Sequence, residues 1–157
     1  MTRIQIIDDD YWCSEAIIAF LRDVSDGAHF ETTCRPEAAD GRDIYIVDNE
    51  FDDGDHGIDL VRSIRERNPD ATIIVCTGTE DRVDAKAVMN AGCNAMVPKG
   101  SAAGREAMAS IVERHIRTRT RSSSSPSFLA ILSDIKSIIV AWNLRMEQDA
   151  AADLSAG

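Results

Sequence analysis

Four short apolar runs, each followed at once by a polar residue, constrain the fold of this chain more than any other feature. They span residues 4–7, 43–47, 72–76 and 95–98. Short apolar runs bounded by turn signals are typical of strands buried on both faces of a parallel sheet. A less apolar run at 29–34 is typical of an edge strand. The carboxyl ends of parallel strands form one ligand-binding edge, so the residues that follow these runs are predicted to share a site.

Segments with helical periodicity alternate with the apolar runs. The first predicted helix follows Asp10, with Ser14 as a residue that can cap it and Asp26 and Gly27 as its end. Further helices are predicted at 57–67, 81–91 and 104–117. Between the predicted strands at 29–34 and 43–47, the sequence holds only a short helical fragment before Gly41. This indicates that the helix of the second connection is reduced. The alternation predicts an α/β fold with a doubly wound five-stranded parallel sheet, flavodoxin-like and of (βα)5 type.

The composition changes after residue 118, where the predicted α/β domain (1–118) ends. Residues 119–127 are rich in Arg and Ser, which is typical of a flexible linker. Within 128–149, apolar residues recur at three- and four-residue steps and predict one amphipathic helix. Residues 150–157 are expected to be a frayed tail. The wide apolar face of the predicted helix requires burial, either on its own domain, in a homodimer or on a target protein.

The composition excludes several classes of protein. A net charge of −10 argues against general nucleic-acid binding. The four cysteines form no CxxC pair and are expected to be reduced thiols of a cytoplasmic protein. No apolar run reaches the roughly 18 residues that a membrane helix needs, and the first run is too short for a signal peptide. We therefore expect no nucleic-acid or membrane partner.

The residues at the strand ends suit a divalent cation together with a phosphoryl group. Asp8, Asp9 and Asp48 are predicted to lie within a few ångströms of one another, where unpaired carboxylates repel and raise each other's pKa. A hard cation such as Mg²⁺ removes this repulsion, because it prefers oxygen ligands. Lys99 offers a point charge for a phosphoryl oxygen, and Thr77 offers a hydroxyl. A carboxylate can also attack phosphorus to form an acyl phosphate.

This constellation resembles the receiver domain of two-component response regulators over about residues 1–118. The matching positions are Asp8 and Asp9 after the first strand, Asp48 after the third, Thr77 after the fourth and Lys99 after the fifth. The resemblance implies that Asp48 is the phosphoacceptor. It also implies that Asp9 and Asp48 bind Mg²⁺ directly, that Asp8 helps through water, and that the backbone carbonyl of Glu50 supplies another ligand.

The resemblance further implies that Lys99 pairs with the phosphoryl group and that Thr77 is the switch hydroxyl that moves toward it. The implied donor is a phosphohistidine on a sensor histidine kinase or a histidine phosphotransfer protein. Three features depart from the family pattern: the 50–57 loop lacks proline and is one residue longer, Met96 replaces a frequent aromatic residue, and Gly100 replaces a frequent proline. These departures put kinase docking and an aromatic rotamer switch in doubt, while the lysine is retained.

Three functions compete. The leading interpretation is a phosphorylation-dependent switch of protein–protein contacts, a phosphoacceptor and not an enzyme. No DNA-binding output is expected, because the predicted C-terminal helix is too short for a winged or helix-turn-helix domain. The second is an atypical receiver that acts as a constitutive binding module without phosphorylation. The third is a phosphatase of the haloacid-dehalogenase type, which Asp8-x-Asp10 resembles. Against that, residues 77–81 are a poor match to the acidic pair that such phosphatases carry near the end of the fourth strand, and a cap domain is absent. Taken alone, Asp10 is expected to be a helix cap or a solvated residue, and His115 is expected on the surface.

Overall fold

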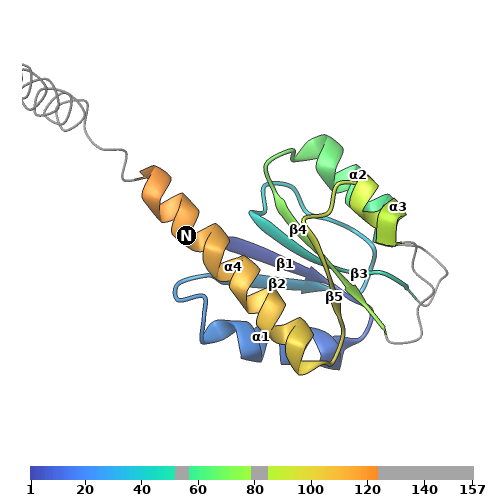
Figure 1. Ribbon diagram of the computed structural model, residues 1–157, viewed down its shortest axis with the longest axis horizontal. Helices are drawn as coiled ribbons and strands as arrows, with labels where there is room; N and C mark the ends of the chain where they lie inside the picture. The colour runs from blue at the N-terminus through green and yellow to red at the C-terminus, as the bar shows by residue number, and fades with distance from the viewer. Residues whose placement is uncertain (52–56, 79–84, 124–157) are drawn as a thin grey trace, which may run out of the picture. The chain divides into compact units, whose positions relative to one another are not determined.

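A computed structural model describes residues 1–51, 57–78 and 85–123 of the chain (Figure 1). Its centre is a five-stranded parallel sheet in the order β2-β1-β3-β4-β5. The strands are β1 (Arg3–Ile7), β2 (His29–Thr33), β3 (Ile44–Asp48), β4 (Thr72–Thr77) and β5 (Ala95–Pro98). All five predicted strands are therefore present, and the flavodoxin-like α/β fold class is confirmed.

Helices cover both faces of this sheet. In the described residues they are α1 (Tyr11–Arg22), α2 (Gly57–Arg67), α3 (Ala85–Asn90) and α4 (Ala102–Ser123). Figure 1 shows α1 and α4 on one face and α2 and α3 on the other. The prediction for α2 is confirmed residue for residue, whereas residues 81–84 of the third predicted helix lie outside the described part. None of the helices described here combines the length and the apolar character needed to cross a bilayer.

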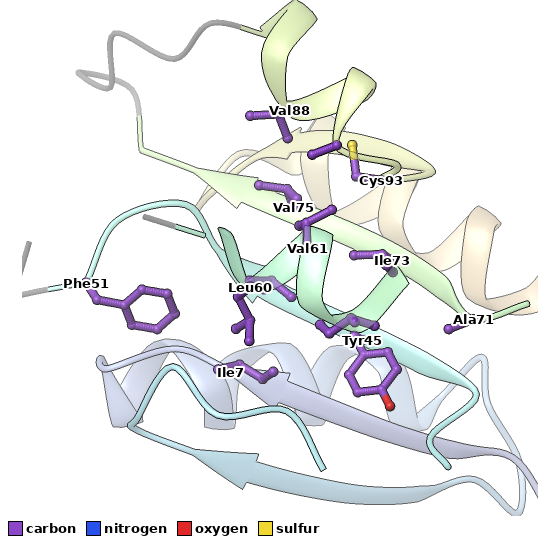
Figure 2. Close-up of a cluster of buried hydrophobic side chains, with 13 residues drawn as sticks. Ile7, Tyr45, Phe51, Leu60, Val61, Ala71, Ile73, Val75, Val88 and Cys93 are labelled. Atoms are coloured by element: carbon purple, nitrogen blue, oxygen red, sulfur yellow. The ribbon is translucent and has the colours of Figure 1, made fainter. Parts of the chain in front are cut away.

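The sheet separates two hydrophobic clusters, because successive side chains of a strand point to opposite faces. Ile4 and Ile6 belong to the cluster beneath α1 and α4. Ile7 lies with Tyr45 and Leu60 in the other cluster, beneath α2 and α3 (Figure 2). Burial on both faces explains why β1 and β3 read as continuous apolar runs and not as alternating ones.

The cap predicted for the first helix is wrong. Asp10 caps α1, since its side chain accepts hydrogen bonds from the backbone N–H groups of Trp12 (2.9 Å) and Cys13 (3.2 Å). Ser14 lies inside the helix and is buried. The helix also ends at Arg22, before the predicted Asp26 and Gly27. Asp10 is the cap because its backbone is extended and its short carboxylate accepts bonds from two N–H groups that otherwise lack a helical partner.

Helix α4 is longer than the predicted 104–117 and reaches Ser123, so it extends into the segment 119–127 predicted as a linker; the linker stays a prediction. The ion pair between Glu113 and Arg117 (3.8 Å) has the spacing that supports a helix. His115, expected on the surface, is half-buried with its Nδ1 2.8 Å from the Thr72 hydroxyl of β4. The chain divides into two units, residues 1–118 and 119–157. The predicted helix at 128–149 and the tail at 150–157 lie outside the described residues.

The connection between β2 and β3 contains no helix, so the second helix of the (βα)5 pattern is absent there, as its weak sequence signal indicated. Polar side chains from the sheet hold this connection instead. The Gln5 side chain accepts a bond from the Ala39 N–H (2.9 Å) and donates to the Glu37 carbonyl (3.3 Å). The Tyr45 hydroxyl donates to the Ala39 carbonyl (2.7 Å). These buried bonds replace the packing that an amphipathic helix would provide.

Helix α2 begins at a glycine that touches the end of β3. The Gly57 N–H donates to the Asn49 carbonyl at 2.8 Å. A Cβ atom at this position would collide with the Asp48 carbonyl oxygen and would lie 3.0 Å from the Asn49 Cα. Both obstacles are backbone atoms, which cannot turn aside as a flexible side chain can. Glycine therefore allows α2 to start directly against the residue that ends β3.

We predict that Gly57→Ala lowers the free energy of unfolding by about 1–3 kcal/mol, the usual cost of inserting a methyl group into a filled space. Urea denaturation measures this loss. The matched control is Glu66→Ala, an exposed position on the same helix, which should stay within about 0.5 kcal/mol of the parent. Equal effects at the two positions would contradict the close approach of α2 to β3.

Candidate functional site

Three carboxylates meet at the carboxyl edge of the sheet. Asp8 follows β1 directly, Asp9 comes next, and Asp48 is the last residue of β3. Each can offer an oxygen atom within 4.8 Å of the others. Asp8 and Asp48 are buried, while Asp9 is partly exposed. The sheet order explains this meeting, because β1 and β3 are adjacent parallel strands that end at the same level.

Lys99 joins this cluster from the end of β5. Its ammonium lies 3.0 Å from Asp8 Oδ2 and forms a second, short ion pair with Asp48 Oδ2. The Lys99 backbone N–H donates to the Thr77 carbonyl at 2.7 Å, which ties the ends of β5 and β4 together. Gly100 follows with a φ of 70°, a conformation that glycine adopts without strain. This turn directs the chain from the lysine into α4.

The environment of the cluster raises the pKa of Asp48 toward neutral pH. Burial raises the pKa of Asp48, the bond from Lys99 lowers it and the nearby charge of Asp8 raises it, and the balance of these effects is a pKa of about 6. Burial works to lower the pKa of Lys99, but its bonds to Asp48 and Asp8 outweigh that effect and raise it above the ordinary value. Lys99 is therefore a permanent cation, while Asp48 exchanges its proton in an accessible pH range.

The structure separates Asp10 from this cluster. Asp10 is exposed, and its carboxylate is used as the cap of α1. Its backbone N–H donates to Asp8 Oδ1 at 3.0 Å, so Asp10 helps to orient Asp8 through the main chain only. A haloacid-dehalogenase-type phosphatase would need the second aspartate of Asp8-x-Asp10 as an acid beside the first. The expectation that Asp10 is a helix cap is confirmed. Its use as a cap removes support from the phosphatase interpretation.

The remaining predicted residues lie around the same edge. Thr77 is the last residue of β4 and is half-buried. Glu50 follows two residues after Asp48, and its N–H donates to Asp48 Oδ1 at 3.4 Å. The switch role of the Thr77 hydroxyl and the metal-ligand role of the Glu50 carbonyl stay predictions. Met96 of β5 packs against the hydrophobic cluster beneath α2 and α3, and residues 52–56 of the altered loop lie outside the described part.

The sequence interpretation missed Cys13 as a neighbour of the site. Cys13 lies in the first turn of α1, its thiol hydrogen-bonds with Asp8, and burial raises its pKa to about 12. The sequence offered both Asp10 and Ser14 as caps, and only with Asp10 as the cap does Cys13 fall in the first turn of the helix, next to the end of β1.

The cluster fits Mg²⁺. Carboxylate oxygens are the ligands this ion prefers, and it is usually held by one or two carboxylates with waters in its other positions. Asp8, Asp9 and Asp48 offer three such oxygens within 4.8 Å of one another. Positive charge at this point also offsets the repulsion among the three carboxylates, which Lys99 alone relieves only in part.

Comparison with known proteins identifies the family. Residues 4–113 match the sequence profile described as the response regulator receiver domain. The chain belongs to this family. No curated protein sequence matches this chain at a significant level. Receiver domains are the phosphoacceptor switches of two-component systems, and they generally interact with histidine kinases or phosphotransfer proteins.

Solved structures share the fold of this receiver domain. A response regulator receiver domain protein from Clostridium thermocellum is 20% identical, with a TM-score of 0.63 over 76% of this chain and 98% of that chain. A CheY-like receiver domain protein from Methanospirillum hungatei is 20% identical, with a TM-score of 0.64 over 77% and 98%. The response regulator TrrA from Thermotoga maritima, solved in complex with Mg²⁺-BeF, is 24% identical, with a TM-score of 0.60 over 73% and 99%.

We predict that the receiver domain binds Mg²⁺ more weakly as the pH falls through about 6. Burial raises the pKa of Asp48 to about 6, so below that pH a proton occupies the carboxylate that the metal needs. The apparent affinity should fall about tenfold per pH unit below 6 and level off above it. Isothermal titration calorimetry measures this profile. Asp48→Asn should bind Mg²⁺ more weakly and lose the inflection, and an inflection that survives in this variant would contradict the assignment.

Proposed function

We propose that Asp48 accepts a phosphoryl group from a phosphohistidine on a sensor histidine kinase or a histidine phosphotransfer protein, and that phosphorylation changes the contacts of the receiver domain with other proteins. One observation carries this proposal. Three carboxylates gather within 4.8 Å at the strand ends, and Lys99 is ion-paired with two of them. This arrangement supports a site in which a nucleophile, cation ligands and a fixed positive charge surround one point.

The transfer step uses a carboxylate oxygen of Asp48 as the nucleophile. A bond forms between this oxygen and phosphorus as the bond between phosphorus and the imidazole nitrogen of the donor breaks. The electron pair of the broken bond stays on that nitrogen, and because the other ring nitrogen of the phosphohistidine carries a proton, the donor histidine leaves as a neutral imidazole. Asp9 and Asp48 would bind Mg²⁺ directly, Asp8 would act through water and the Glu50 carbonyl would be a further ligand, and the bound ion would supply positive charge that stabilises the phosphoryl oxygens.

Lys99 keeps Asp48 ready for this step and then holds the product. Its ammonium neutralises Asp48 before transfer. The acyl phosphate carries additional negative charge and oxygen acceptors, so the ammonium pairs with a phosphoryl oxygen afterwards. The Thr77 hydroxyl, on the neighbouring strand, donates to another of these oxygens. Because the Thr77 carbonyl also binds the Lys99 N–H, movement at β4 is passed to β5.

The second candidate function, a constitutive binding module, is favoured by one feature. Met96 occupies the position of the frequent aromatic switch residue and packs into the core, so an aromatic rotamer cannot report the state of Asp48. Retained activity of Asp48→Asn in cells would support that module. The ion-paired and buried Asp48 nevertheless favours phosphorylation, because a binding module gains nothing from three neighbouring carboxylates.

We predict that acetyl phosphate with Mg²⁺ adds one phosphate to the protein and that Asp48→Asn abolishes this adduct. Intact mass spectrometry measures the adduct. Asp10→Asn is the matched control, since Asp10 is acidic and adjacent but serves as a cap, and it should keep the adduct. Lys99→Met should reduce the yield, because the phosphoryl group then lacks its fixed cation. Phosphate that persists in Asp48→Asn would refute Asp48 as the acceptor.

We further propose that residues 128–149 associate with a second copy of the chain or with a target protein. The support is the apolar stripe in the sequence of this segment together with its place after the 1–118 unit. A stripe this wide is stable only when another surface covers it. This association would give the receiver domain a means to act without a nucleic-acid-binding output.

For the version with a second copy, we predict that the full chain is a dimer and that a chain ending at Ser123 is a monomer. Multi-angle light scattering measures both masses. Ile135→Glu places a charge in the apolar stripe and should also give a monomer, because burying an unpaired charge is costly. Ser133→Glu, two residues away and outside the stripe, is the matched control and should remain dimeric. A full chain that is monomeric would leave only the target-protein version.

A further inference from the structure

A small cavity lies beneath two helices on one face of the sheet. Its wall includes Ala16 and Ile17 of α1, Met108 of α4 and Cys76 of β4, and its volume is about 90 Å³. Figure 1 shows both helices on this face. Cys76 and Met108 are buried in the core, whereas Ala16 is exposed to solvent. The cavity therefore leads from the surface into the hydrophobic cluster of this face.

The two thiols in the wall behave as apolar groups. Burial raises the pKa of Cys13 to about 12 and raises the pKa of Cys76 as well. Both thiols are therefore protonated near neutral pH and add no negative charge to the cavity. A neutral thiol packs as a small hydrophobic group. Together with the alanine, isoleucine and methionine side chains, the thiols make the wall suitable for hydrocarbon.

One cation at the wall is not used by any carboxylate in the part of the chain that the structure describes. Arg105 Nη1 donates to the Gly100 carbonyl at 3.0 Å, and Gly100 is a wall residue too, so this bond holds the guanidinium beside the cavity. The described ion pairs do not include Arg105. Lys99 also lines the cavity, but Asp8 and Asp48 already pair with its ammonium. The wall therefore offers a single positive charge to a ligand.

We propose that this cavity binds a short-chain monocarboxylate, with its hydrocarbon chain inside and its carboxylate paired with Arg105. A guanidinium binds a carboxylate through two parallel hydrogen bonds. Acidic side chains, which would repel an anion, do not line the cavity. A phosphate ester carries close to two negative charges, so it matches the single available cation less well than a carboxylate does.

The volume of the cavity limits the length of the hydrocarbon chain. An apolar cavity of about 150 Å³ holds benzene, which has six carbon atoms. In proportion, a volume of about 90 Å³ takes roughly three or four carbon atoms. Butyrate has three carbon atoms beyond its carboxylate, so it is the ligand chosen for the test.

This ligand site is distinct from the phosphoacceptor site, although the two are neighbours. Cys76 immediately precedes Thr77 and is the register partner of Asp48 across β3 and β4. Lys99 belongs to both sites, and its charge offsets repulsion between a bound carboxylate and Asp8. Binding requires neither Mg²⁺ nor a phosphoryl group, so the inference goes beyond the proposed function and does not rest on it.

The test is a titration of the full chain with sodium butyrate at constant ionic strength, without Mg²⁺ or a phosphodonor. Chemical shifts in ¹H–¹⁵N NMR spectra report binding. We expect saturable shifts at the amides of Ile17, Gly100 and Met108, with a Kd in the millimolar range that is usual for so small a ligand. Acetate should bind about fifteenfold more weakly, because it lacks two CH₂ groups that each contribute about fourfold when buried.

Variants at exposed positions separate the two contacts. Arg105→Gln removes the cation and should weaken butyrate binding about tenfold. Its matched control is Arg114→Gln, an exposed position of the same helix outside the cavity. Ala16→Leu fills the mouth of the cavity and should abolish binding, whereas Ala19→Leu, also exposed on α1 but outside the cavity, should not. Circular dichroism confirms that each variant is folded.

Four results would overturn the proposal. Butyrate that causes no saturable shifts would do so, as would acetate that binds as tightly as butyrate. Unchanged affinity in Arg105→Gln or in Ala16→Leu would remove the assigned contacts, and an equal loss in the matched controls would show that the effects are not specific to the cavity. Failure of Asp48 to accept phosphate would refute the proposed function and leave this result untouched.

Discussion

The ion pairs of Lys99 with Asp8 and Asp48 are the interaction on which the site depends. Two of these three groups are buried carboxylates, and a buried charge without a partner is strongly destabilising. The lysine makes their proximity tolerable in the protein without metal, although it leaves Asp48 with a raised pKa. The same ammonium therefore permits the cluster and, in the proposed function, would pair with the phosphoryl group that Asp48 gains.

The sheet makes this cluster possible by ending strands at one level. β1 and β3 are neighbours, and β5 reaches the cluster because its chain continues from Pro98 into Lys99 while β4 lies between. Two hydrophobic clusters, one on each face, fix these strands from both sides. Gly57 then lets α2 begin against the Asp48 carbonyl. Core packing, the glycine at the start of α2 and the strand order together hold the carboxylates close to one another despite their mutual repulsion.

The sequence predicted the strands, and the meeting of the three carboxylates and Lys99 at their ends, because both depend on local signals. A buried strand needs a short apolar run, and a polar residue after that run has only one edge of the sheet to occupy. The features that the sequence did not predict depend on competition between residues far apart or between two local options. Asp10 and Ser14 could each cap α1, and only the observed geometry decides between them. The cavity lined by Cys13, Cys76 and Met108 combines three elements, which no spacing along the chain reveals.

Hydrogen bonds at both ends of β5 connect the site with the rest of the domain. At its carboxyl end, the Lys99 N–H binds the Thr77 carbonyl. At its other end, the Arg65 guanidinium of α2 donates to the Gly92 carbonyl and to Asn94 Oδ1, which clamps the turn before the strand. Helix α3 lies just before that turn, and Val88 is the buried residue of its described part, Ala85–Asn90. An element with few buried contacts moves at low cost in free energy, so in the proposed switch a change at Lys99 would reach α3 through β5.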